Sequence, residues 1–210
     1  MATPTTLWPV DQIGLFPLGI VLLPTERIPL HIFEPRYREL IHECLTHGLE
    51  FGLVFADEEG ARELGTRARV TEVLERFDDG RMNVLVQGGE RFRVDSLTEG
   101  RTFITALVEP VEDEVSEIDP ETAAKTAGLF RALVALADAE AEEVDEQSPV
   151  LSFELAAQVE LEPEAKQALL ELLSEQSRLE LLAKLLDAAR IALLAARELG
   201  DRAQRNGSRL

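Results

Sequence analysis

The sequence is short of the residues on which several kinds of protein depend. Its single cysteine, Cys44, excludes an intramolecular disulfide and a multi-cysteine zinc site. It has only three lysines, and its formal net charge of -19 argues against nucleic acid and against an anionic membrane surface as partners. The longest uncharged run, residues 12–25, is shorter than the roughly 20 apolar residues that span a membrane. No positively charged stretch precedes the first apolar run, so we expect no secretory signal and a cytoplasmic protein.

The common catalytic motifs are missing as well. The sequence contains no G-x-x-x-x-G-K-[ST] phosphate loop, no G-x-G-x-x-G run and no G-x-S-x-G nucleophile motif. His42 and His47 are five residues apart, which does not match the i, i+4 spacing of a zinc-binding helix. Cys44 lies between them on the apolar face of a predicted helix, so we expect a buried structural cysteine rather than half of a Cys–His catalytic pair. We therefore predict a protein that is not an enzyme, with no catalytic residue, no metal ligand and no cofactor.

Charge and aromatic residues divide the chain into parts. Nine of the eleven aromatic residues precede residue 104, whereas the region after residue 120 is rich in Leu, Ala and Glu. Aromatic residues favour strands, and Leu, Ala and Glu favour helices. Residues 111–147 hold 12 acidic and 2 basic residues, about half of the excess charge. We predict an α+β chain with a β-barrel domain (8–112), an acidic first helix and connection (113–147), a helical bundle (148–200) and a flexible tail (201–210).

The barrel prediction rests on short apolar runs bounded by Gly and Pro. We expect strands at residues 13–16, 20–23, 27–33, 51–55, 68–77, 81–87, 91–97 and 103–108. One helix should start near Glu34, with Pro35 at its first position, and stop at Gly48. Many short strands with a single helix indicate a small mixed barrel.

Further helices are predicted from capping residues followed by proline or by apolar periodicity. We expect them to begin at Asp119, Ser148, Pro163 and Ser174. The last helix should run from about Glu175 to Leu199, and two neighbouring stripes of Leu and Ala follow its length. Packing inside the bundle explains such stripes, and the alternative is weak homo-oligomerisation through this helix. The acidic residues 137–147 are interpreted as a solvated helix end or linker.

Several motifs, occurring in order, resemble the Lon substrate-binding domain family, the N-terminal region of the Lon protease. The resemblance lies in Leu15-Phe16-Pro17-Leu18, Val21 with Pro24, Pro29-Leu30-His31-Ile32-Phe33-Glu34-Pro35-Arg36-Tyr37, Cys44-Leu45, Phe51-Gly52, Gly65-Thr66 with Ala68 and Val70, Asp79-Gly80-Arg81, Gly88 with Glu90-Arg91-Phe92-Arg93, Lys166-Gln167 with Leu169-Leu170-Glu171, Arg178-Leu179 and Leu185-Leu186. It covers about residues 13 to 190. Members of the family often have glycine where this chain has Thr25, which leaves the turn at that position open.

The resemblance implies a PUA-like six-stranded β pseudobarrel with one helix, followed by a C-terminal α-helical bundle. In the full protease this region recognises substrate, and ATPase and peptidase domains follow it; we expect this chain to end before either begins. The implied function is a non-catalytic module, related to proteolysis, that binds unfolded or exposed apolar protein segments. Alternatives are an RNA-binding PUA-like module, with an arginine patch at Arg67, Arg69, Arg91 and Arg93, or an adaptor for a separate ATP-dependent protease.

The residues that carry the family resemblance either stabilise the fold or bind a ligand. We expect Phe33, Tyr37 and Phe92 in the core, because aromatic side chains supply much of the buried area of a small barrel. The polar candidates for peptide binding are Glu34, Arg36, Arg91 and Arg93, since arginine binds backbone carbonyls and carboxylates. The alternative for them is structural, with Glu34 paired to Arg91 or Arg36 at the corner between strand and helix.

Overall fold

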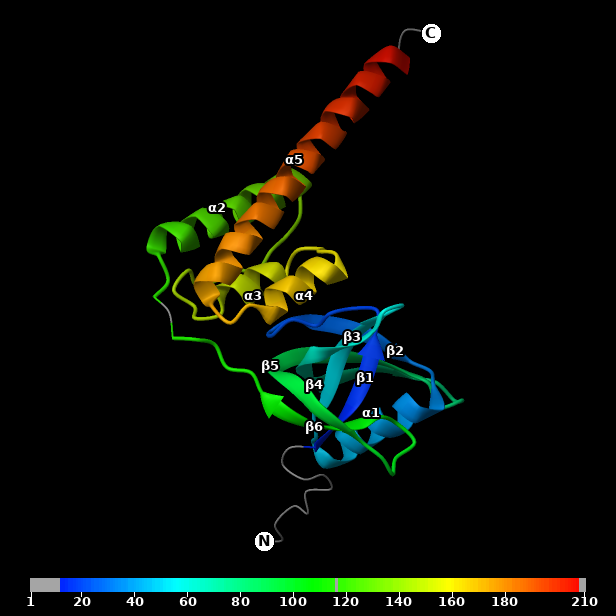
Figure 1. Ribbon diagram of the computed structural model, residues 1–210. Coiled ribbons are helices and arrows are strands. Elements are labelled where there is room, and N and C mark those ends of the chain that lie inside the picture. The colour runs from blue at the N-terminus through cyan, green and yellow to red at the C-terminus, as the bar shows by residue number, and fades with distance from the viewer. Residues whose placement is uncertain (1–11, 116, 208–210) are drawn as a thin grey trace. The chain divides into compact units, whose positions relative to one another are not determined.

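The computed structural model describes residues 12–115 and 117–207, and its backbone contacts separate into two compact units (Figure 1). The barrel unit contains residues up to Glu112 together with Glu160–Glu171, and the helical unit contains Asp113–Val159 and the chain from Leu172 onward. The predicted barrel domain began at residue 8, and residues 8–11 lie outside the described residues. Residues 160–171, which we assigned to the helical bundle, group with the barrel instead.

The barrel unit is a six-stranded mixed sheet, as expected. Its strands are β1 (Gln12–Leu18), β2 (Arg27–Ile32), β3 (Phe51–Asp57), β4 (Gly60–Arg76), β5 (Met82–Thr98) and β6 (Thr105–Pro110). They are ordered β2-β5-β4-β3-β1-β6, and a further pairing of β5 with β6 closes the sheet into a barrel. Only β1 and β3 run parallel, and helix α1 (Pro35–His47) provides the connection between β2 and β3.

Two sequence predictions for the strands were wrong. The runs at residues 81–87 and 91–97 form one continuous strand, β5, whose first half pairs with β2 and whose second half pairs with β6. Residues 20–23 form no strand, although Val21, Leu22 and Leu23 are buried. A short apolar run signals burial, and burial alone does not separate a strand from a buried loop.

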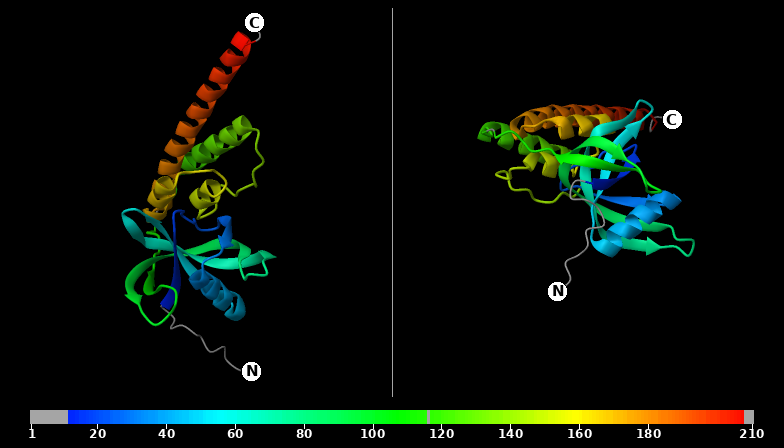
Figure 2. Two further views of the ribbon diagram at one scale, coloured as in Figure 1. Left: turned by 90° about the vertical axis from the view of Figure 1, so that its right-hand side faces the viewer. Right: turned by 60° about the horizontal axis from the view of Figure 1, so that its bottom comes forward.

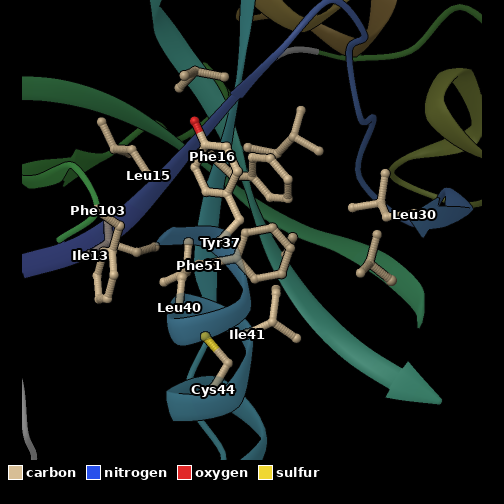
Figure 3. Packing of buried hydrophobic residues seen from close by; sticks show 14 of the residues in the cluster. Ile13, Leu15, Phe16, Leu30, Tyr37, Leu40, Ile41, Cys44, Phe51 and Phe103 are labelled. Carbon is tan, nitrogen blue, oxygen red and sulfur yellow. The ribbon is translucent and has the colours of Figure 1, made fainter. Parts of the chain in front are cut away.

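The barrel core is filled from the strands on one side and from α1 on the other (Figure 3). Helix α1 directs Tyr37, Leu40, Ile41 and Cys44 inward, in agreement with the predicted apolar face. The Tyr37 ring stacks on Phe16 with ring centroids 4.0 Å apart. The helix ends at Gly48, whose φ of 66° is the left-handed conformation that glycine adopts readily.

Close packing around Phe92 and the neighbouring strands explains two glycines that carry the family resemblance, Gly52 and Gly65. Its side chain is fully buried in the barrel core. A Cβ atom on Gly52 would lie 2.5 Å from the Phe92 ring, and one on Gly65 would lie 2.4 Å from the carbonyl oxygen of Leu53. These residues are therefore glycine because the strands pass too close to their neighbours for a side chain.

Polar contacts attach helix α4 (Pro163–Glu171) to the barrel strands and to the segment before β2. Lys166 forms a salt bridge with the buried carboxylate of Glu26, and Gln167 donates to the carbonyl of Leu64 at 3.4 Å. Arg91 on β5 donates from Nη1 to the carbonyl of Leu170 at 2.7 Å. Helical periodicity cannot show which neighbour a helix packs on, which explains why α4 was assigned to the bundle.

The helical unit contains α2 (Pro120–Ala137), α3 (Leu151–Ala156) and α5 (Glu175–Gly207). Asp119 caps α2 by accepting from the backbone N–H groups of Glu121 and Thr122, as its sequence position predicted. Figures 1 and 2 show α2 and α5 side by side, with α5 continuing well beyond the end of α2. The tail predicted from residue 201 is helical as far as Gly207, because α5 does not stop at Gly200; residues 208–210 lie outside the described residues.

Arg178 lies at the centre of the helical unit and is fully buried. It donates to Asp113 at 2.8 Å, to the Leu172 carbonyl at 2.9 Å and to Glu175 at 2.7 Å. Its guanidinium also lies 4.4 Å from the centre of the Phe153 ring. Burial alone would lower the pKa of Arg178, but the hydrogen bonds to Asp113 and the charge of Glu175 raise it, so the guanidinium stays charged.

Among the described helices, none is both long and apolar enough to cross a membrane.

Candidate functional site

The corner between β2 and α1 exposes aromatic side chains on the surface of the barrel unit. Phe33 is 59% exposed, and its ring lies 5.9 Å from that of His31. The His31 ring also meets the edge of Phe77, from the turn between β4 and β5, at 5.9 Å. Together with Glu34 and Arg36 at the start of α1, these residues make up what we call the corner surface. An exposed aromatic cluster with charged neighbours is typical of a surface that binds another protein.

Contacts with polar neighbours hold two of the aromatic side chains of the corner surface, His31 and Phe77. His31 Nδ1 lies 2.6 Å from Asn83 Oδ1, and Asn83 in turn donates to Glu75 at 2.9 Å. The Arg81 guanidinium lies 5.2 Å from the centre of the Phe77 ring. The His31 and Phe77 rings are thus positioned before any partner arrives, which lowers the entropy cost of binding.

Glu34 and Arg36 pair with each other on the same surface. Arg36 Nε donates to Glu34 Oε2 at 2.9 Å, and its guanidinium lies 4.5 Å from the centre of the Tyr37 ring. Both side chains of the pair are more than a third exposed. Of the two pairings suggested for Glu34, the structure therefore contains the one with Arg36, and an exposed pair of this kind adds little stability.

The other two predicted site residues lie apart from this pair. Arg91 is buried and holds α4 through the Leu170 carbonyl. Arg93 is half exposed and lies 3.6 Å from Glu63. The four candidates therefore do not form one cluster, and only Glu34 and Arg36 belong to the corner surface.

The expectation that Phe33 lies in the core was wrong, whereas Tyr37 and Phe92 are buried as expected. The alternation of side chains along β2 indicated that Phe33 is exposed. Leu30 and Ile32 point inward, so His31 and Phe33 point outward. The apolar character of Phe33 concealed this alternation.

The described residues hold no arrangement suited to catalysis by Cys44 or to metal binding. Burial raises the pKa of the Cys44 thiol to about 12, so the thiol is protonated at neutral pH and is a poor nucleophile. Its sequence neighbours His42 and His47 are both exposed, away from the buried sulfur. No group of three His, Cys, Asp or Glu residues within the described part of the chain could hold a metal ion.

Comparison with known proteins is consistent with this architecture. The model of the family described as "ATP-dependent protease La (LON) substrate-binding domain" matches residues 12–188. Lon protease 2 of Myxococcus xanthus is 29% identical over 188 residues, which cover 81% of this chain and 22% of that protein. Lon protease of Parabacteroides distasonis is 30% identical over 112 residues, 49% of this chain and 14% of that protein. This chain therefore spans less than a quarter of the length of these relatives.

Solved structures give the same assignment. The crystal structure of a Lon N-terminal domain protein from Xanthomonas campestris is 27% identical, has a TM-score of 0.66, and matches over 82% of this chain and 97% of that chain. The N-terminal domain of a Mycobacterium avium complex Lon protease, 18% identical with a TM-score of 0.62, shares the fold over 84% of this chain and 98% of that chain. Because the family model covers most of the chain, the protein belongs to the Lon protease substrate-binding domain family.

Proposed function

We propose that this protein is a non-catalytic module that binds exposed apolar segments of other proteins. The observation that carries the proposal is the exposed aromatic cluster of the corner surface, with Phe33 at its centre. Membership of a family named for substrate binding supports it, as does the protonated, buried state of Cys44. The Lon proteases among its relatives support a context of proteolysis for such binding, and we propose a separate protease as a partner.

The backbone of β2 favours recognition by side chains over addition of a peptide strand. The backbone N–H of Gly88 on β5 donates to the Glu26 carbonyl. In an antiparallel pair, every second residue directs its N–H and C=O at the neighbouring strand, so Ile28, Leu30 and Ile32 face β5 as Glu26 does. The backbone groups of Arg27, Pro29 and His31 therefore point to the open edge of β2. Pro29 has no N–H to offer there, which interrupts any added strand. A bound segment would instead insert apolar side chains beside Phe33 and Phe77.

The test is binding of a reduced, alkylated and therefore unfolded protein, compared with the same protein in its native state. We expect the unfolded form to bind and the native form not to bind. Phe33→Ser should weaken binding about tenfold, equivalent to about 1.4 kcal/mol, because an exposed aromatic anchor is lost. The matched control is Leu97→Ser, which removes a 68% exposed apolar side chain elsewhere on the same barrel unit and should leave binding unchanged.

Two results would overturn the proposal. One is equal, negligible binding of the unfolded and the native protein. The other is an effect of Leu97→Ser as large as that of Phe33→Ser. The segment would then bind nonspecifically to exposed apolar side chains and not at the corner surface.

The RNA-binding alternative has little support from the surface. Of the arginines suggested for a patch, Arg69 pairs with Glu50 at 2.9 Å, Arg93 lies beside Glu63, and Arg91 is buried. The carboxylates beside Arg69 and Arg93 compete with phosphate for their guanidinium groups. An RNA mobility-shift assay at low salt tests the alternative directly, and a shift that disappears with added salt would favour it.

A further inference from the structure

The helical unit contains an apolar cavity of about 420 Å³ between α2 and the loop that follows it. Phe130, Val134 and Ala135 on α2 form one wall, and Ala141 and Val144 on the loop form the other. The side chain of Phe130 is buried beneath it, whereas the alanines on both walls are exposed. The cavity is therefore open to solvent and large enough for one or two apolar side chains.

The loop is held in place by contacts at several points. At the end of α2, Asp138 has a φ of 53° and directs its N–H back to the carbonyls of Val134 and Ala135, which reverses the chain. Further along, the backbone N–H of Glu142 donates to the Gln158 side chain at 2.7 Å, and Arg131 pairs with Glu146 at 2.8 Å. These contacts keep the loop, and with it the second wall of the cavity, at a fixed distance from α2.

The rim of the cavity is strongly acidic. Glu142 and Glu143 line it directly, and residues 138–146 carry six carboxylates in all. Arg131 is the basic residue among the lining, and it is already paired with Glu146. The rim therefore presents uncompensated negative charge around an apolar floor, which is complementary to a partner that is apolar and positively charged.

A second cavity in the same unit has a different character. It measures about 430 Å³ between α2 and α5, and its lining includes Lys125 and Lys184 as well as Glu180 and Asp187. Its charges balance, although its size is nearly the same. Size alone therefore does not distinguish the two cavities, and the excess of negative charge does.

We propose that the cavity between α2 and the loop 139–147 is a second binding site, which takes an extended segment of another protein carrying apolar side chains beside Lys or Arg. The apolar side chains fill the cavity above Phe130, and the basic side chains meet Glu142 and Glu143 at its rim. This site belongs to the helical unit and does not depend on the corner surface. It gives the protein a preference for basic apolar segments.

The test uses two synthetic 12-residue peptides, each with four arginines; four leucines occupy the centre of one, and four serines occupy the centre of the other. The wild-type protein should bind the leucine peptide about tenfold more tightly than the serine peptide at low salt, and both should weaken as salt screens the rim. Glu142→Gln with Glu143→Gln should weaken both peptides several-fold. The control pair Glu72→Gln with Glu99→Gln makes the same change in charge at exposed residues of the barrel unit and should have little effect.

Two further variants separate the apolar wall from the charge. Val134→Ser should reduce the preference for leucine over serine, with helix content checked by circular dichroism. Ala141→Lys, on the exposed loop, should weaken both peptides without endangering the fold. Phe33→Ser should keep the full preference, which distinguishes this site from the corner surface.

The proposal is overturned if the wild-type protein binds both peptides equally, or if the two charge pairs have equal effects. Loss of the leucine preference in Phe33→Ser would also overturn it, because the peptide would then occupy the corner surface.

Discussion

Among the residues whose burial the structure describes, each of the two units buries one arginine, but the two side chains have different roles. Arg91 is buried in the barrel unit, where it attaches α4 through the Leu170 carbonyl beside a core of apolar side chains. Arg178 is buried inside the helical unit. It donates hydrogen bonds to Asp113 before α2, to the carbonyl of Leu172 before α5, and to Glu175 in the first turn of α5. Both units have apolar cores, but the buried charges described in the barrel unit hold α4, whereas those of the helical unit form a network that joins several of its segments.

This difference has a consequence for stability. A buried charge network adds little to the free energy of unfolding compared with an apolar core of the same size. Removing one of its members lowers that free energy strongly, because each remaining charge is left buried without its partner. The helical unit should therefore depend on single polar residues more than the barrel does.

The largest effect is expected for Arg178→Met, which leaves Glu175 buried without its partner. We predict a loss of about 3–5 kcal/mol in the free energy of unfolding of the helical unit. Urea unfolding followed by circular dichroism measures it. The control is Arg190→Met, because Arg190 pairs with Asp187 at the same i, i+3 spacing on an exposed part of α5, where the loss should stay below about 1 kcal/mol. Equal losses for the two variants would remove the distinction between the units.

A smaller effect is expected for Arg91→Met, which leaves the Leu170 carbonyl without this donor. We predict a loss of about 1–3 kcal/mol in the free energy of unfolding of the barrel unit. Helix α4 should detach before the barrel itself unfolds. Hydrogen exchange of residues 163–171 measures the release. Arg93→Met, two residues along the same strand and exposed, is the control and should leave α4 protected. A loss as large as that of Arg178→Met would show that the barrel depends on its buried arginine to the same extent.

A gain of stability is expected for Thr25→Gly. Thr25 has a φ of 70°, so the chain keeps the left-handed turn that suits glycine, and a β-branched residue is strained there. We predict an increase of about 1 kcal/mol in the free energy of unfolding, measured from the shift in the midpoint of urea unfolding. Asp138→Gly, at the other left-handed residue that is not glycine, should gain less, since aspartate tolerates this conformation better. No gain of stability in Thr25→Gly would mean that the turn at Thr25 is not strained.

The smallest effect concerns pH. Burial raises the pKa of Glu175, and hydrogen bonds from Ser152 and the charge of Arg178 offset this only in part. The folded protein therefore holds this proton at a pH where the unfolded chain has released it, so stability falls as the pH rises from the ordinary pKa of glutamate through the raised one. Glu175→Gln should lack this component of the pH dependence, whereas Glu180→Gln, at an exposed glutamate of the same helix, should keep it. An unchanged pH profile in Glu175→Gln would contradict the assignment.

The sequence predicted those features that depend on local pattern. The start of α1 at Pro35, its apolar face and the cap at Asp119 follow from neighbouring residues, and all three are confirmed. The family resemblance added the barrel, whose closure by β5 and β6 no local pattern reveals. The position of α4 could not be predicted, because the contact between Lys166 and Glu26 joins residues 140 positions apart.

The candidate site was predicted only in part, for a related reason. Glu34 and Arg36 were identified from composition and motif, and they lie on the corner surface as a pair. Phe33 follows His31 closely in the sequence, but Phe77 comes from a distant segment, and the pairing of β2 with β5 brings its ring to His31. The acidic segment after α2 was interpreted as a solvated helix end or linker, because its charge pattern does not reveal the apolar wall behind it.

The central claim, that the corner surface binds exposed apolar segments, is tested most directly by hydrogen exchange in the presence of an unfolded protein of near-neutral charge. We predict slower exchange at residues 27–36 and 77–87, and loss of that protection in Phe33→Ser. Protection confined to other parts of the chain, or protection that persists unchanged in Phe33→Ser, would contradict the account.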